Sequence, residues 1–277
     1  MRRKIFEDYL PAGMGPLKII LADIYLSLGG VSRNLYLVGG LVPEFLVTNK
    51  LSYLREYLGT LDIDLAVELA VEGNSRFKDF YDRLRGLGFE KQKTDDGLDF
   101  MSHSFVKHEP GNREVVLDLI VDDKFEPQAD KLKEISPNVE AAKFRGVSLV
   151  FADYLSRDIK GSKGEITTIK IANLIPFITL KSFTYVDPDN GSAKDAFDIW
   201  YTIVNYGEGP DSVNREALHY RDNPDVQDAL KAIKEVFDDE SSQGTKDVVD
   251  ILMQRYGLDR PRANREVVSP LRLVKGL

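Results

Sequence analysis

Residues 62–68, Asp-Ile-Asp-Leu-Ala-Val-Glu, alternate acidic and apolar side chains. A period of two is typical of a β-strand with one apolar face and one polar face. Asp62 and Asp64 are therefore expected on the same face of this strand. Their carboxylates repel each other unless a cation lies between them, and Mg²⁺ takes oxygen ligands of this kind. Acidic residues also line the solvent face of many ordinary strands, so the pair alone does not define a metal site.

A third carboxylate, Asp118, interrupts the apolar run 115–121, which also has the composition of a strand. An aspartate buried there without a partner would be costly. One solution is a paired core aspartate. The other is a divalent metal, which the sequence favours if this strand lies beside residues 62–68, because the three carboxylates would then converge.

Two glycines, Gly39 and Gly40, follow the short apolar strand 35–38 and precede a predicted short helix at 41–48. Glycine allows close approach of the backbone to phosphates, and amides at a helix N-terminus attract anions. The glycines and lysine of a Walker loop or a dinucleotide fingerprint are missing. A simple tight turn is the alternative interpretation.

The remaining pattern predicts an α/β (α+β) fold, with a mixed sheet and flanking helices over residues 1–172 and a helical domain over 173–277. Asn223 and Pro224 form an N-cap and first-turn proline for one helix of the second domain. The further helices and strands expected in the first domain are helices at 17–28 and 77–87, and strands at 99–106, 114–121, 145–151 and 165–172.

Composition narrows the function classes. The chain has 277 residues and a net charge of −8, which argues against broad coating of nucleic acid. It has no cysteine, which excludes disulfides, thiolate zinc sites and cysteine nucleophiles. The apolar stretch 171–180 is shorter than the roughly 20 residues of a membrane helix, and Glu7 and Asp8 interrupt any signal-peptide core. We therefore expect a cytoplasmic protein without a membrane segment, and a solvated basic terminus at 260–265.

Taken together, the strand–Gly-Gly–helix unit, the segment Gly59-Thr60-Leu61-Asp62-Ile63-Asp64 and the strand around Asp118 resemble the DNA polymerase β-type nucleotidyltransferase core. The likeness is closest to AbiEii-type nucleotidyltransferases, the toxin components of type IV toxin–antitoxin systems. An apolar helix ending at Lys181, and a later helix carrying Lys194, Asp195 and Asp198, are similar to that family. The resemblance covers about residues 35–203.

This resemblance implies transfer of a nucleoside monophosphate from a nucleoside triphosphate to a hydroxyl of tRNA or of a protein, and a possible antitoxin partner. It implies Mg²⁺ or Mn²⁺ held by Asp62, Asp64 and Asp118, with Asp118 helping to deprotonate the acceptor. Lys181 would meet the triphosphate, and Asp198 would act in catalysis. The residues implied in nucleotide binding are Gly39, Gly40, Thr60, Lys181, Lys194 and Asp195.

The chain departs from the family pattern at two points. Leu41 stands where family members often have serine or threonine, and 21 residues separate Gly40 from Asp62, which implies an inserted loop. Two other functions stay open: an aminoglycoside-type nucleotidyltransferase, and a degenerate core kept as an interaction module. Lys181 could also extend along an apolar helix to solvent, and Asp195 and Asp198 could lie on a solvated helix face.

Overall fold

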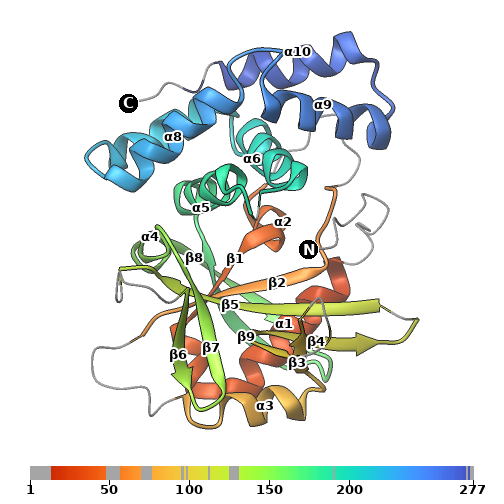
Figure 1. Cartoon of the computed structure of the whole chain (residues 1–277), viewed down its shortest axis with the longest axis vertical. Helices are drawn as coiled ribbons and strands as arrows, with labels where there is room; N and C mark the ends of the chain where they lie inside the picture. The colour runs from red at the N-terminus through yellow and green to blue at the C-terminus, as the bar shows by residue number, and fades with distance from the viewer. Residues whose placement is uncertain are drawn as a thin grey trace. The chain divides into compact units, whose positions relative to one another are not determined.

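The computed structural model describes residues 14–47, 57–69, 77–94, 97, 99–111, 113–124, 131–189, 191–272 and 274. The predicted α/β class is confirmed, with about 50% helix and 25% strand (Figure 1). The chain forms two compact units. The first comprises Met1–Val42 and Leu58–Ala172, and the second comprises Pro43–Tyr57 and Asn173–Leu277. Residues 43–57 thus cluster with the helices that follow Ala172, although they lie between two parts of the α/β unit in the sequence.

The first unit is built on one mixed sheet of nine strands within the described residues. Its strand order is β3-β4-β5-β2-β1-β9-β8, and the β6–β7 hairpin joins through β7 to β5. β2 runs parallel to β5 and antiparallel to β1, and β1 runs parallel to β9. The strands are β1 (Leu35–Val38), β2 (Asp62–Val67), β3 (Glu90–Lys93), β4 (Phe100–Glu109), β5 (Arg113–Asp122), β6 (Leu132–Ser136), β7 (Val139–Phe144), β8 (Tyr154–Lys160) and β9 (Ile166–Ala172).

Alternation along β2 and β5 separates the two faces of this sheet. Ile63, Leu65 and Leu117 are completely buried on one face. Helices α1 (Met14–Leu28) and α3 (Phe80–Gly86) cover that face (Figure 1). The other face carries Asp62 and Asp64. The predicted helix at 17–28 and the predicted strands at 35–38, 62–68 and 114–121 therefore all form, because their apolar periodicity matches the faces that pack.

The stretch Met14–Asn34 is the one candidate for a membrane span among the described residues, judged by length and a mean hydropathy of 1.4. It exceeds the stretch 171–180 that the sequence reading took as the longest apolar run. In the structure α1 packs against β8 and β9, and Leu21 and Ile24 are completely buried. A helix in the core of a globular domain has the same apolar composition.

The strand predicted at 145–151 is wrong. Residues Ser148–Ala152 form helix α4, and strand β8 follows it at Tyr154–Lys160. A short apolar run fits a strand or a buried helix equally well by periodicity. The tertiary structure decides here, because the carboxylate of Asp122 accepts a hydrogen bond from the Ser148 amide at 2.5 Å and satisfies a donor at the start of the helix. The sequence predicts none of the strands β3, β6, β7 and β8.

The second unit is helical. Its helices are α2 (Pro43–Leu46), α5 (Leu174–Val186), α6 (Ala193–Asn205), α7 (Pro210–Ala217), α8 (Pro224–Val236), α9 (Gln243–Tyr256) and α10 (Arg260–Leu271). Within it α5 packs on α6 and α8, and α6 packs on α9 and α10. The predicted cap of α8 is confirmed, since Asn223 accepts from the amides of Asp225 and Val226. Residues 260–265 are the first turns of α10 with Asp259 as N-cap, and the exposed side chains of Arg260, Arg262 and Arg265 make this basic segment solvated, as expected.

Candidate active site

The three carboxylates singled out in the sequence lie on two neighbouring strands of the first unit. β2 and β5 pair in parallel with Asp64 opposite Asp118 and Asp62 opposite Val116. Since side chains alternate between faces, Asp62, Asp64 and Asp118 all lie on the face opposite to α1 and α3. Each is half-buried. Like charges directly opposite each other in a sheet destabilise it, so this arrangement needs a compensating reason.

Gly39 lies against Asp64, which places the Gly-Gly turn beside the carboxylates. Val38, the last residue of β1, pairs with Asp64, and Gly39 then turns the chain with φ +70°. A Cβ on Gly39 would lie 1.8 Å from Oδ2 of Asp64. Residue 39 must therefore be glycine for two reasons, a left-handed backbone and the space taken by the carboxylate. The chain continues as a short 3₁₀ turn over Gly39–Leu41 and then α2.

The residues next to these positions are Leu41 and Thr60. Leu41 is completely buried, so it belongs to the core. Thr60 is 4% exposed, and its hydroxyl accepts a hydrogen bond from the Asp62 amide at 3.4 Å. Thr60 thus supports the start of β2. Most of the inserted loop, residues 48–56, lies outside the described residues.

A serine that the sequence reading missed contacts Asp118 from the other side. β4 pairs with β5 so that Ser104 lies opposite Asp118. The Ser104 hydroxyl is 2.5 Å from Oδ1 of Asp118 and 2.6 Å from Oε1 of Gln92 on β3. Ser104 is 1% exposed. Nothing local in the sequence distinguishes this serine from Ser102, because the contact depends on strand pairing between distant segments.

The donor chemistry of this face fits a hard divalent cation. Three carboxylates at matched register provide oxygen ligands, and the close approach of Gly39 leaves room for the Asp64 carboxylate where a side chain would fill the space. In the present side-chain conformations, the described residues contain no group of three or more His, Cys, Asp or Glu placed to hold a metal ion. Residues and register therefore fit such an ion, while the side chains would have to turn toward one another to bind it.

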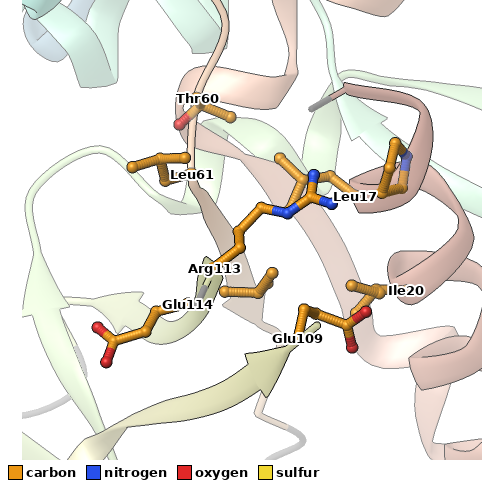
Figure 2. Close-up of a pocket in the computed structure, with 9 residues that line it drawn as sticks. Leu17, Ile20, Thr60, Leu61, Glu109, Arg113 and Glu114 are labelled. Atoms are coloured by element: carbon orange, nitrogen blue, oxygen red, sulfur yellow. The ribbon is translucent and has the colours of Figure 1, made fainter. Parts of the chain in front are cut away.

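A shallow depression of about 260 Å³ lies away from these carboxylates, on the face that α1 covers. Figure 2 shows Arg113 reaching across it between Leu61 and Leu17, with Glu114 pointing away. Its lining is otherwise mostly apolar. None of the three carboxylates lines it. It lies where α1 packs near the β4–β5 hairpin.

In the second unit, the predicted residues of α5 and α6 form one buried ionic network. Nζ of Lys181 lies 2.7 Å from Oδ1 of Asp195 and 3.1 Å from Oδ2 of Asp198. Nζ of Lys194 lies 2.8 Å from both carboxylate oxygens of Asp198. Asp198 is completely buried, and the side chain of Lys181 is 12% exposed. Lys181 therefore does not extend to open solvent, and Asp198 does not lie on a solvated helix face.

Asp195 has a second role in this network. It is the N3 residue of a capping box with Ser192 at the start of α6, where a negative charge is favourable. Burial opposes its ionisation, but Lys181 and the hydrogen bonds from Ser192 outweigh burial and hold the pKa of Asp195 below its usual value. Burial lowers the pKa of Lys194, against the opposing effect of Asp198. Two lysines and two aspartates thus balance in charge.

Tyr57 completes the network, and no sequence signal pointed to it. Its hydroxyl donates to Oδ1 of Asp198 and lies 3.1 Å from Nζ of Lys194. Its ring packs against Phe197 and Tyr201. Burial, together with the charge of Asp198, raises the pKa of Tyr57 well above its usual value, so this hydroxyl stays a donor. These contacts join Tyr57 to α6.

The chain was compared with protein-family models and with curated proteins. No family model and no curated protein matches it.

Proposed function

We propose that this protein is a metal-dependent nucleotidyltransferase that moves a nucleoside monophosphate from a nucleoside triphosphate to a hydroxyl acceptor. The observation that supports it best is the register of β2 and β5, which sets Asp64 opposite Asp118 with Asp62 on the same face and Gly39 against Asp64. Repulsion among three neighbouring carboxylates destabilises the sheet, so packing alone does not explain them. Carboxylates in this arrangement can bind divalent cations that in turn bind a polyphosphate.

In this reaction the acceptor oxygen forms a bond to the α-phosphorus while the bond from that phosphorus to the bridging oxygen of the β-phosphate breaks. Pyrophosphate leaves, and the hydroxyl proton passes to a carboxylate, for which Asp118 is our candidate. Asp62, Asp64 and Asp118 would hold Mg²⁺ or Mn²⁺, which neutralises phosphate charge and stabilises the attacking and leaving oxygens. Backbone amides of the turn at Gly39 and Gly40 are our candidates for contact with a phosphate.

The proposal extends to the biological class. The residues that resemble AbiEii-type enzymes suggest a toxin-type nucleotidyltransferase of a type IV toxin–antitoxin system, with tRNA or a protein as acceptor and a possible antitoxin partner. Such an enzyme would work in the cytoplasm, where nucleoside triphosphates are available. Contact of Lys181 with the triphosphate, nucleotide binding by Thr60, Lys194 and Asp195, and a catalytic role for Asp198 remain predictions.

The test is label transfer. The protein is incubated with each α-labelled triphosphate, Mg²⁺ and total cellular RNA or protein, and the labelled product is separated by electrophoresis. We expect transfer from wild type and a loss of at least about a hundredfold in Asp62→Asn, because charge placement at the reacting phosphate is the main source of rate in phosphoryl transfer. Circular dichroism should show the same fold for both.

Glu90→Gln is the matched control, because Glu90 is an exposed carboxylate on β3 of the same sheet. It should retain full transfer. Full transfer by Asp62→Asn would contradict the proposed site. Absence of both transfer and metal-dependent nucleotide binding in wild type would instead favour a degenerate interaction module, and transfer to cationic small molecules alone would favour the aminoglycoside-type enzyme.

A further inference from the structure

Asp118 is flanked across the sheet by two different groups. Asp64 lies opposite it on β2, and Ser104 lies opposite it on β4. The first neighbour repels the carboxylate when both are ionised. The second donates a hydrogen bond to Oδ1 at 2.5 Å, a length typical of a charge-assisted O–H···O⁻ contact. This bond fixes one oxygen of Asp118 on the β4 side.

The proton positions follow from the chemistry of the three groups. A serine hydroxyl carries one proton, so Ser104 donates to either Asp118 or Gln92 and must accept from the other. An ionised carboxylate cannot donate. Donation to Asp118 is the contact used here, and it leaves Ser104 without a proton for Oε1 of Gln92. Turning over the Gln92 amide would bring its NH₂ to Ser104, so that hydrogen bonds would run from Gln92 through Ser104 to Asp118.

The pairing of β3 with β4 changes at the residue that contacts Ser104. The pairing of β3 with β4 is regular up to Lys91 and becomes irregular between Lys91 and Lys93, at Gln92 itself. Such irregularities re-aim side chains and occur often beside active sites. Ser104 is almost completely shielded from solvent. Water is therefore poorly placed to replace its hydroxyl.

We propose that Ser104 is a positioning residue, oriented by Gln92, that anchors one oxygen of Asp118 on the β4 side and so limits how far this carboxylate must turn to share a metal ion with Asp64. The inference rests on the proposed function and deepens it. Partners that orient a metal-binding carboxylate typically change metal affinity 10- to 100-fold when they are removed. A serine with a purely structural role would leave metal affinity unchanged.

The test measures Mn²⁺ binding to the full chain, without nucleotide, from the free Mn²⁺ signal in electron paramagnetic resonance. We expect Ser104→Ala to bind Mn²⁺ at least about tenfold more weakly than wild type, and Asp118→Asn to bind as weakly or more weakly. Ser102→Ala is the matched control. Ser102 lies on the same face of β4, but its hydroxyl donates to Glu140 instead of Asp118. This control should bind Mn²⁺ as wild type does.

The outcomes separate the two proposals. If Asp118→Asn loses binding while Ser104→Ala binds like wild type, the role of Ser104 is overturned and the metal site stands. If wild type binds no Mn²⁺, the proposed metal site fails and the role of Ser104 fails with it. Should Ser104→Ala not fold, Gln92→Leu removes the orienting amide, and an affinity reduced by roughly threefold or more is expected. Unchanged affinity in Gln92→Leu would then overturn the proposal.

Discussion

At the scale of single residues, the positions of the Asp64 and Asp118 carboxylates depend on two neighbouring residues. Gly39 accommodates the Asp64 carboxylate, and Ser104 donates to Asp118. Neither residue is itself a proposed metal ligand. Gly39, in the turn after β1, leaves space for the carboxylate of Asp64 because it has no side chain. The hydroxyl of Ser104, on β4, fixes one oxygen of Asp118.

Replacing Gly39 by alanine tests this restriction. Its φ of +70° costs an L-residue about 1–2 kcal/mol, and the new Cβ would also overlap the Asp64 carboxylate. We expect Gly39→Ala to lower the free energy of unfolding in urea by clearly more than that backbone cost. Gly257→Ala is the control, since Gly257 has φ +68° with nothing within 4 Å of its Cβ position.

A double-mutant cycle with Asp64→Ala isolates the overlap. Truncating Asp64 removes the two carboxylate atoms closest to the added Cβ, so Gly39→Ala should cost less in that background, with a coupling of about 0.5–3 kcal/mol. Strict additivity of the two substitutions would show that Asp64 does not occupy the position described.

At the scale of elements, α5 and α6 are joined by charges buried between them. Lys181 comes from α5, whereas Lys194, Asp195 and Asp198 come from the first turns of α6. A buried ion pair is weak evidence for net stability, but removal of one partner leaves an uncompensated charge. Tyr57 contributes a neutral donor to Oδ1 of Asp198, which also accepts from Lys194.

Tyr57→Phe removes that donor and, with the same oxygen, an acceptor for Nζ of Lys194. We expect the free energy of unfolding to fall by about 1–3 kcal/mol, because a buried acceptor loses a hydrogen bond that water cannot replace. Denaturant unfolding followed by circular dichroism measures this. Tyr185→Phe is the control: Tyr185 donates to Asp247 at 2.9 Å in a half-buried position, so its loss should cost less. Equal losses would argue against a fully shielded Tyr57 contact.

At the scale of the whole molecule, ligand binding should appear as a change in thermal stability. A group that binds only the folded state stabilises it by about 2.7 kcal/mol at a hundredfold excess over Kd. The charge of Asp64 is expected to have two opposite effects on the melting temperature. Without metal it repels Asp118 and lowers the melting temperature. With metal it contributes to binding and raises the melting temperature.

Asp64→Asn should therefore melt at a higher temperature than wild type in EDTA, where removal of one charge relieves repulsion. With Mg²⁺ or Mn²⁺ and nucleotide, wild type should gain Tm and the variant should lose most of that gain. Differential scanning fluorimetry measures both shifts. A variant that melts lower in EDTA and keeps the full shift with metal and nucleotide would falsify a shared site for these carboxylates.

The sequence by itself determined the elements whose signals are local. The period of β2 put Asp62 and Asp64 on one face, apolar spacing produced α1, and Asn223-Pro224 began α8. These signals suffice because side-chain direction follows directly from 3.6- and 2-residue periods. They also indicate the α/β class, since both strands and helices occur up to residue 172 and only helices follow.

Only the tertiary structure decided which distant residues meet. Asp64 and Asp118 are opposite because β2 and β5 pair in one register, and a shift by one residue would have moved Asp118 to the other face. The contacts of Ser104 with Asp118 and of Tyr57 with Asp198 arise in the same way, from segments far apart in the chain. Residues 148–152 became a helix rather than a strand because Asp122 supplies an acceptor for its first turn. Such choices depend on partners that a local pattern does not contain.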